Sequence, residues 1–135
     1  MQYDEFIRQV QDQANLESPD EGAGITRAVL ETLGERLDRT VRDGVEAQLP
    51  RELKGFLLNR AGPAPERYNL VEFYKRVGAR ADLKYYDAAE RTWQVFAVLK
   101  QAIPEGEVQD ILKSLPEEFG ELFGKDTPGQ VRPKP

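Results

Sequence analysis

Two residue types are missing from this chain altogether: its 135 residues include neither a cysteine nor a histidine. Without cysteine there is no disulfide, thiolate nucleophile, zinc–thiolate site or iron–sulfur cluster. Without histidine there is no imidazole base, no Ser-His-Asp triad and no haem held by a proximal histidine. Most common catalytic constellations are therefore excluded. We predict a protein that is not an enzyme, with no catalytic residue, no metal ligand and no cofactor.

Long apolar runs and an excess of positive charge are missing as well. No segment approaches the roughly 20 apolar residues that a membrane-spanning helix needs. The opening stretch, MQYDEFIRQVQDQ, is acidic and amphipathic, unlike a secretory signal. The net charge is −5, and an acidic chain lacks the general attraction to phosphate that drives nonspecific binding to nucleic acids and anionic lipids. We therefore expect a cytoplasmic protein that binds neither nucleic acid nor membrane.

The apolar residues recur at helical spacing, and the alternating pattern typical of strands is missing. Two sets share this spacing: Tyr3, Phe6, Ile7, Val10 and Ala14, then Leu70, Phe73, Val77 and Ala81. Ser18 followed by Pro19 predicts a helix start, because serine caps free N–H groups and proline suits the first helical position. Asn69, with Glu72 three residues later, predicts a second capped start. The pattern indicates an all-α fold.

The sequence also repeats itself. A shift of 67 residues, changing to 66 after a one-residue gap, brings identical residues together: Glu5 with Glu72, Phe6 with Phe73, Val10 with Val77, Ala14 with Ala81, Leu16 with Leu83, Asp20 with Asp87, Ala23 with Ala89, Thr26 with Thr92, Val29 with Val95, Leu33 with Leu99, Leu49-Pro50 with Leu115-Pro116 and Glu52 with Glu118. These thirteen identities fall over about 55 positions, where typical composition gives roughly three or four by chance. We infer an internal duplication.

We predict a compact helical bundle in which two homologous repeats pack about a pseudo-twofold axis. One repeat of about 55 residues buries only a marginal core by itself, so the two copies should pack face to face. A short fourth helix should begin in each repeat with a proline, Pro50 or Pro116, in its first turn. The predicted organisation is a single domain 1–135, with repeat one at 3–58, a linker at 59–67, repeat two at 68–124 and a flexible tail at 125–135.

Three features recur in the same order in both copies: an acidic–aromatic start, a long second helix and a Leu-Pro corner. They are Tyr3-Asp4-Glu5-Phe6, AVLETLGERL at 28–37 and Leu49-Pro50, then Val71-Glu72-Phe73, residues 92–103 and Leu115-Pro116. In this order and spacing, over residues 3–124, the chain resembles the bacterial family called domain of unknown function 2267. The resemblance implies an all-α fold built from the duplication and brings no established activity, ligand or catalytic residue. Copy two departs at Gln101–Ile103, where QAI replaces ERL, so any role of Arg36 is confined to copy one.

Large aromatic side chains are concentrated in the second copy, and two of them, Tyr85 and Tyr86, are adjacent. Because neighbouring residues of a helix point in different directions, at least one of this pair should be exposed. Exposed aromatic side chains anchor protein interfaces. We therefore predict a partner surface at Tyr85 and Tyr86. In the alternative, these two tyrosines and Trp93 form the walls of a ligand pocket.

A second candidate surface is cationic. Arg36, Arg39 and Arg42 recur every three residues at the corner between the second and third predicted helices, where they would grip a phosphate or an acidic partner. Acidic side chains between them nearly neutralise the corner: Glu35, Asp38 and Asp43. The same pattern therefore fits a solvated, salt-bridged corner.

Paired carboxylates are the third candidate. Glu5 with Glu72, and Asp20 with Asp87, occupy equivalent positions in the two copies. A pseudo-twofold axis would bring such pairs together, to share a proton or to bind a hard cation. First helical turns favour acids through the helix dipole in any case, and we prefer that structural interpretation.

The leading functional hypothesis is a non-enzymatic interaction module: a small acidic helical domain that docks to a protein partner or to a second copy of itself. The alternative is a binder of a small apolar ligand, held in a cavity between the two repeats. An enzyme that relies on carboxylate, tyrosine, lysine or arginine chemistry ranks third.

Overall fold

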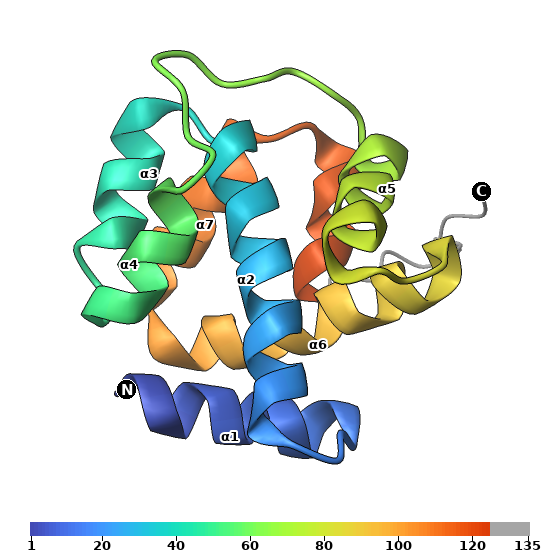
Figure 1. Cartoon of the computed structure of the whole chain (residues 1–135). Helices are drawn as coiled ribbons and strands as arrows, with labels where there is room; N and C mark the ends of the chain where they lie inside the picture. The colour runs from blue at the N-terminus through green and yellow to red at the C-terminus, as the bar shows by residue number, and fades with distance from the viewer. Residues whose placement is uncertain (125–135) are drawn as a thin grey trace.

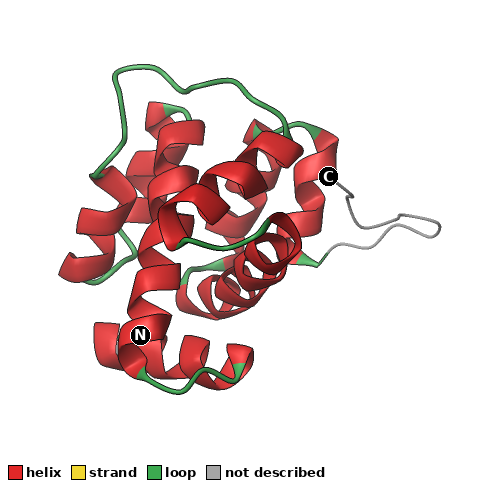
Figure 2. Ribbon diagram, turned by 45° about the vertical axis from the view of Figure 1, so that its right-hand side comes forward, coloured by secondary structure: helices red, strands yellow, loops and turns green. Residues whose placement is uncertain are grey.

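The computed structural model describes residues 1–124, and this part of the chain consists of helices and loops without a strand (Figure 2). In chain order the elements are α1 (Tyr3–Ala14), α2 (Pro19–Arg36), α3 (Arg39–Glu46), α4 (Arg51–Leu58), α5 (Leu70–Ala81), α6 (Tyr85–Ala102), α7 (Glu105–Ser114) and the 3₁₀ helix η1 (Glu117–Phe123). The all-α prediction is confirmed. The tail predicted at 125–135 lies outside the described residues. Within 1–124, none of the helices combines the length and the apolar character that crossing a bilayer requires.

Side-chain caps explain where three of the helices begin, α2, α3 and α5, and two of these caps were predicted. The Ser18 hydroxyl accepts a hydrogen bond from the Glu21 amide at 3.3 Å. The Asn69 side-chain oxygen accepts one from the Glu72 amide at 2.9 Å. Each cap satisfies an N–H group that has no partner inside its helix, so both predicted helix starts are confirmed.

The short fourth elements differ in detail from the prediction. Pro50 and Pro116 lie immediately before α4 and η1, with extended backbone, rather than inside the first turn. Proline suits this position because it has no N–H group that would need a partner. The second of these elements is a 3₁₀ helix rather than an α-helix.

The two halves of the chain contain matching elements. Helices α1 and α5 each have 12 residues, and α2 and α6 each have 18. Helix α1 packs against α2 and α6, and in the same way α5 packs against α6 and α2. In each half the first helix thus packs against the second helix of both halves, which is the arrangement that a pseudo-twofold axis would produce. The duplication itself stays a prediction.

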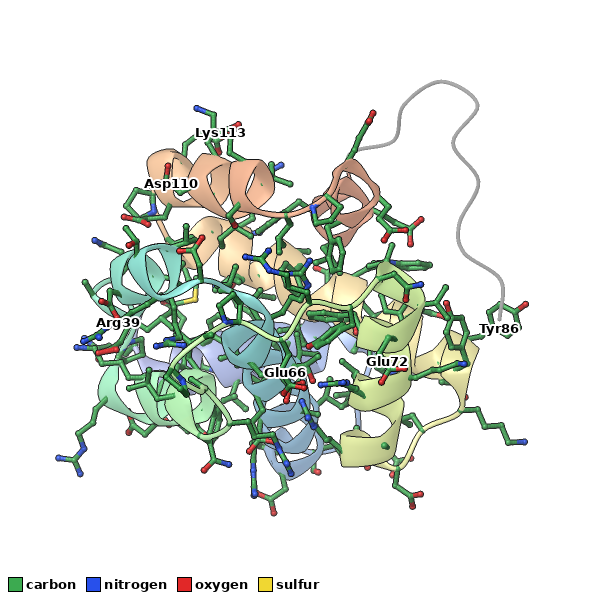
Figure 3. All side chains as sticks on the ribbon, turned by 90° about the horizontal axis from the view of Figure 1, so that it is seen from above. Arg39, Glu66, Glu72, Tyr86, Asp110 and Lys113 are labelled. Carbon is green, nitrogen blue, oxygen red and sulfur yellow. The ribbon has the colours of Figure 1, made fainter. Side chains whose placement is uncertain are left out.

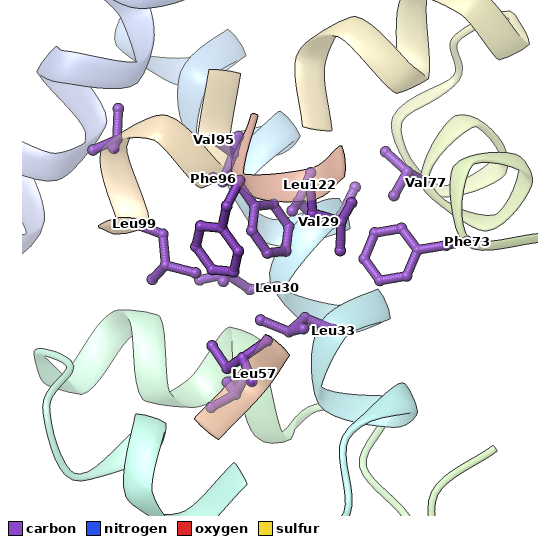
Figure 4. Close-up of a cluster of buried hydrophobic side chains, with 14 of the residues drawn as sticks. Val29, Leu30, Leu33, Leu57, Phe73, Val77, Val95, Phe96, Leu99 and Leu122 are labelled. Carbon is purple, nitrogen blue, oxygen red and sulfur yellow. The ribbon is translucent and has the colours of Figure 1, made fainter. Parts of the chain in front are cut away.

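Helix α2 is central to the molecule. In Figure 1 it runs upright between α5 on the right and α3 and α4 on the left, with α1 below it. Its side chains Val29 and Leu33 belong to a buried cluster that includes Leu57 of α4, Phe73 of α5 and Phe96 of α6 (Figure 4). All five are fully buried. The core is therefore built from both halves of the chain at once.

The connector between the halves arches over one end of α2 (Figure 1). It contains the segment predicted as the linker, residues 59–67, and leads to Asn69, the cap of α5. The Glu66 amide donates a hydrogen bond to the Glu35 carbonyl oxygen at 3.0 Å, which ties the connector to α2.

One glycine permits α2 and α4 to touch. A Cβ atom at Gly34 would lie 1.7 Å from the carbonyl oxygen of Leu57, a backbone atom that cannot rotate aside. The position therefore requires glycine although it lies inside a helix, where glycine is normally unfavourable. Gly55, in the middle of α4, has no atom within 4 Å of the equivalent point.

Replacing Gly34 by alanine should lower the free energy of unfolding by at least about 2 kcal/mol, because the methyl group forces α2 and α4 apart. The matched control Gly55→Ala should leave that free energy unchanged or raise it by up to about 1 kcal/mol, since alanine is the better helix former. Urea denaturation followed by circular dichroism measures both. Equal stability of Gly34→Ala and wild type would contradict the close contact between the helices.

Candidate functional site

One aromatic side chain projects from the first turn of α6. Tyr86 is 56% exposed, the largest exposed fraction of any large hydrophobic side chain within residues 1–124. Figure 3 places it at the edge of the molecule. Its neighbour Tyr85 is half-buried and packs against the core. One ring of the pair is therefore exposed and the other packs inward, as expected for adjacent residues of a helix.

Tyr86 is the outer end of a chain of four aromatic rings, which we call the aromatic ladder: Tyr86, Tyr85, Tyr74 and Trp93. The ring centres of Tyr86 and Tyr85 lie 5.6 Å apart at an interplanar angle of 84°. The next two steps measure 5.9 Å at 88° and 6.1 Å at 89°. All three are edge-to-face contacts at distances where aromatic pairs attract each other.

Hydrogen bonds hold the inner end of the aromatic ladder in place. The indole N–H of Trp93 donates to the Tyr74 hydroxyl at 2.7 Å, and this hydroxyl donates to the Glu121 carboxylate at 2.7 Å. Burial, followed by the hydrogen bond to Glu121, raises the pKa of Tyr74, so the hydroxyl stays protonated. The exposed ring therefore rests on a fixed support.

The hydroxyl of Tyr85 is different. It is buried, yet it has no hydrogen-bond partner among the described residues. Burial first, and then the negative charge of Glu121, raises its pKa. Because a buried hydroxyl without a partner does not stabilise the fold, the ring of Tyr85 is the part that matters for the ladder.

A pocket of about 390 Å³ lies between the two halves of the chain. The first half contributes Leu16, Glu21, Gly24 and Ile25, and the second contributes Arg80, Ala81, Leu83 and Arg91. This volume is in the range of small-molecule sites. A hollow therefore exists where the ligand-binding hypothesis requires one.

Arg80 connects this pocket to a buried ionic cluster, the Glu35 cluster. The Glu35 carboxylate accepts hydrogen bonds from Arg80 Nη2 at 2.9 Å, Arg76 Nη1 at 2.9 Å and the Tyr68 hydroxyl at 3.1 Å. Arg80 Nη1 also donates to the Thr32 hydroxyl at 2.8 Å. Burial alone would raise the pKa of Glu35, but the hydrogen bonds from Arg80 and Arg76 more than offset burial and lower it to about 2.

A second buried carboxylate lies one turn earlier in α2. Glu31 is ion-paired with Arg27 at 3.2 Å and with Arg60 at 3.4 Å, and it accepts a hydrogen bond from the Asn59 side chain. Burial raises the pKa of Glu31, but these hydrogen bonds, that from Asn59 first, produce a net lowering. The connector is therefore held to α2 at its beginning as well.

Arg36, predicted to contribute to a cationic surface, is buried instead. Its Nε donates to the Tyr68 carbonyl oxygen at 3.0 Å. The guanidinium lies over the rings of Tyr68 and Phe119, 5.7 and 5.1 Å from their centres. A guanidinium stacked on aromatic rings stabilises this packing and is not available to an outside anion.

The other two arginines do not complete such a surface. Arg42 is also buried, and its Nη1 donates to the Gly62 carbonyl oxygen at 3.2 Å. Arg39 is exposed, 3.9 Å from Asp43, and in Figure 3 it lies on the opposite side of the molecule from Tyr86. The predicted anion or partner patch of Arg36, Arg39 and Arg42 is therefore corrected: two of the three hold the connector.

The paired carboxylates gain no support as a site. Glu5, Asp20 and Asp87 are exposed, and Glu72 forms an ion pair with Arg76 at 2.9 Å. Within residues 1–124 no three acidic side chains are grouped closely enough to hold a metal ion.

Sequence reasoning missed the Glu35 cluster, although a signal was present. Glu31 and Glu35 lie four residues apart in a stretch rich in apolar residues, and Arg76 and Arg80 share that spacing in α5. Residues four apart lie on one face of a helix. Two acids on one helix and two bases on another are the pattern of a buried ionic contact.

The Glu35 cluster predicts a pH-dependent contribution to stability. Since the pKa of Glu35 is lowered from 4.5 to about 2 on folding, its contribution is complete above pH 4.5 and is lost as the pH falls towards 2. Glu35→Gln should lower the free energy of unfolding at pH 7 by about 3 kcal/mol, because the half-buried Arg80 loses its ion-pair partner and Arg76 loses one of its three. Urea denaturation at a series of pH values should show the gap between variant and wild type closing from pH 5 to pH 2. A gap that stays constant over this range would contradict the assignment.

Removing the Tyr85 hydroxyl should not lower the free energy of unfolding. Tyr85→Phe keeps the ring of the aromatic ladder and deletes an unpaired buried hydroxyl, so the free energy of unfolding should stay level or rise by up to about 1 kcal/mol. Tyr74→Phe, which breaks two hydrogen bonds, should lower it. Thermal denaturation compares the two variants, and a destabilised Tyr85→Phe would show that its hydroxyl has a partner.

The all-helical arrangement can be compared with known protein families. Residues 3–122 match the family model described as "Uncharacterized conserved protein (DUF2267)". No curated protein matches the chain significantly. The family match extends from the start of α1 to the last turn of η1 and agrees with the resemblance seen in the sequence. The chain belongs to the DUF2267 family of uncharacterized conserved proteins.

Proposed function

We propose that this protein is a non-enzymatic interaction module that binds a basic segment of a partner protein through Tyr86. The observation that carries the proposal is the exposure of this ring on a buried aromatic support. The lack of histidine and cysteine supports a role without catalysis. A cytoplasmic location is part of the proposal, since a chain without cysteine needs no oxidising compartment to fold.

The aromatic ladder makes Tyr86 a suitable anchor. Interface residues that dominate binding are enriched in tyrosine and tryptophan. Binding also costs less when a side chain is already held in place. The Tyr86 ring satisfies both conditions because Tyr85 supports it edge-to-face and Tyr74 supports Tyr85.

Charge favours a basic partner. The protein has a net charge of −5. Around Tyr86, the exposed acids Asp87 and Glu90 outnumber the exposed Lys84, and Glu90 lies one helical turn further along the same face. The face of a tyrosine ring attracts cations. An arginine or lysine that packs on Tyr86 would therefore gain a cation–π contact with the ring and the attraction of the nearby acids. A second copy of this acidic chain would be repelled in solution.

Affinity capture from the host's lysate, followed by calorimetry on the purified partner, tests the proposal. The Tyr86→Ala variant should weaken binding by about 30-fold or more, the effect of removing an anchor worth at least about 2 kcal/mol. Leu58→Ala, at the 39% exposed leucine of α4, is the matched control and should bind within about twofold of wild type.

The captured protein should be basic where it binds, and raising the salt concentration should weaken the complex. Unchanged binding by Tyr86→Ala would refute the proposed surface. If sedimentation shows a dimer of wild type that Tyr86→Ala abolishes, the ladder serves self-association and the basic partner is wrong.

The pocket between the halves supports a second candidate function, the binding of a small apolar ligand. Four of its lining residues have hydrocarbon side chains: Leu16, Ile25, Ala81 and Leu83. The pocket does not involve Tyr86, so the two functions can be tested separately. Line broadening or shifts of pocket amides in NMR spectra with an apolar probe such as cyclohexanol would support it. Spectra unchanged at millimolar concentrations would remove it.

A further inference from the structure

The pocket between the halves is lined by residues that are equivalent in the repeat alignment. Leu16 corresponds to Leu83, and Ile25 corresponds to Arg91. At the first pair both copies keep leucine. At the second pair, one copy has a buried isoleucine and the other has a half-buried arginine. Beside its apolar side chains the pocket is lined by three charged residues, Glu21, Arg80 and Arg91, and at Arg91 the other copy has an apolar residue.

Arg91 forms no ion pair with any residue in the described part of the chain. Its Nη1 donates to the neutral side chain of Gln94 at 3.0 Å. Arginine has five N–H donors, so further donors remain for a ligand. Arg80, by contrast, is paired with Glu35 at 2.9 Å. Glu21 also lines the pocket, and its negative charge opposes an anion, so Arg91 is the residue on which a carboxylate would have to bind.

We propose that this pocket binds a small amphiphilic monocarboxylic acid, with its carboxylate on Arg91 and its hydrocarbon portion against Leu16, Ile25 and Leu83. The assignment rests on the second candidate function and names its ligand class. Arginine pairs with a carboxylate through two parallel N–H donors, which a neutral ligand cannot use in this way. Covering the apolar side chains removes them from water and supplies the rest of the affinity.

Two other hollows of similar volume do not offer this combination. One, of about 430 Å³, is lined by α1 and α2 of the first half only, and carries two acids, Asp4 and Asp20, against one arginine, Arg8. The other, of about 370 Å³ between α3 and α7, is lined mainly by polar and charged side chains, among them Glu107 and Asp110. The first hollow therefore has no net positive charge that could hold a carboxylate. The second would repel a carboxylate through its own acidic side chains.

Gly24 provides a test that leaves the fold intact. It lines the pocket, and a Cβ atom there would have no neighbour within 4 Å. Gly24→Leu would place a side chain over the pocket and would also improve the helix propensity of α2. Gly55→Leu is the matched control, because Gly55 is equally open and lies in α4, away from the pocket.

The experiment is an NMR titration of the ¹⁵N-labelled full chain with sodium octanoate, using octan-1-ol as the neutral probe of the same chain length. Octanoate should shift the amides of Gly24, Leu83 and Arg91, and Gly24→Leu should abolish these shifts while Gly55→Leu retains them. Arg91→Gln should weaken octanoate binding by about tenfold without changing octanol binding, and Arg91→Lys should restore part of the loss.

Three outcomes would overturn the proposal. If millimolar octanoate shifts no pocket amide, the pocket does not bind such acids. Both the proposed ligand class and the candidate ligand-binding function for acids would then be wrong. Octanoate shifts that Gly24→Leu leaves unchanged would place the binding elsewhere. Equal binding of octanol and octanoate, insensitive to Arg91→Gln, would leave an apolar-ligand site in place and reject the carboxylate assignment alone.

Discussion

The arrangement of this molecule depends on one buried carboxylate. Glu35 is buried near the C-terminal end of α2, and it is held by two arginines of α5 and by the Tyr68 hydroxyl at the end of the connector. A carboxylate can be buried at this depth only because positive charge and hydrogen bonds replace its water. The same contacts fix α5 and the connector against the central helix. The apolar contacts of the core hold the helices together but are not directional. The hydrogen bonds of the Glu35 cluster are directional, and they determine where α5 lies along α2.

The position of α5 determines the geometry of both candidate sites, the aromatic ladder and the pocket between the halves. Tyr74, the buried ring that supports the aromatic ladder, is on one face of this helix, and Arg80 at its end lines the pocket between the halves. Repositioning α5 would therefore move the support of Tyr86 and reshape the pocket together.

The sequence was sufficient for features that depend on local chemistry. The caps at Ser18 and Asn69 and the exposure of one of two adjacent tyrosines all follow from neighbours within a helical turn. Features that depend on distant residues were missed. Arg36 and Arg42 look like solvated charges in sequence, but contacts to Tyr68 and Gly62, far along the chain, bury them. The alternative hypothesis placed a cavity between the halves, but it did not include Arg91, because that position carries isoleucine in the other copy.

A double-mutant cycle between α2 and α5 tests whether the Glu35 cluster positions α5. The free energy of unfolding would be measured by urea denaturation for wild type, Glu35→Gln, Arg80→Gln and the double variant at pH 7. If the Glu35 cluster positions α5, the two residues should be coupled by more than about 1 kcal/mol, since replacing either one removes the ion pair between them. Losses that add to within about 0.5 kcal/mol would show that the two side chains act independently and that the core alone places the helix.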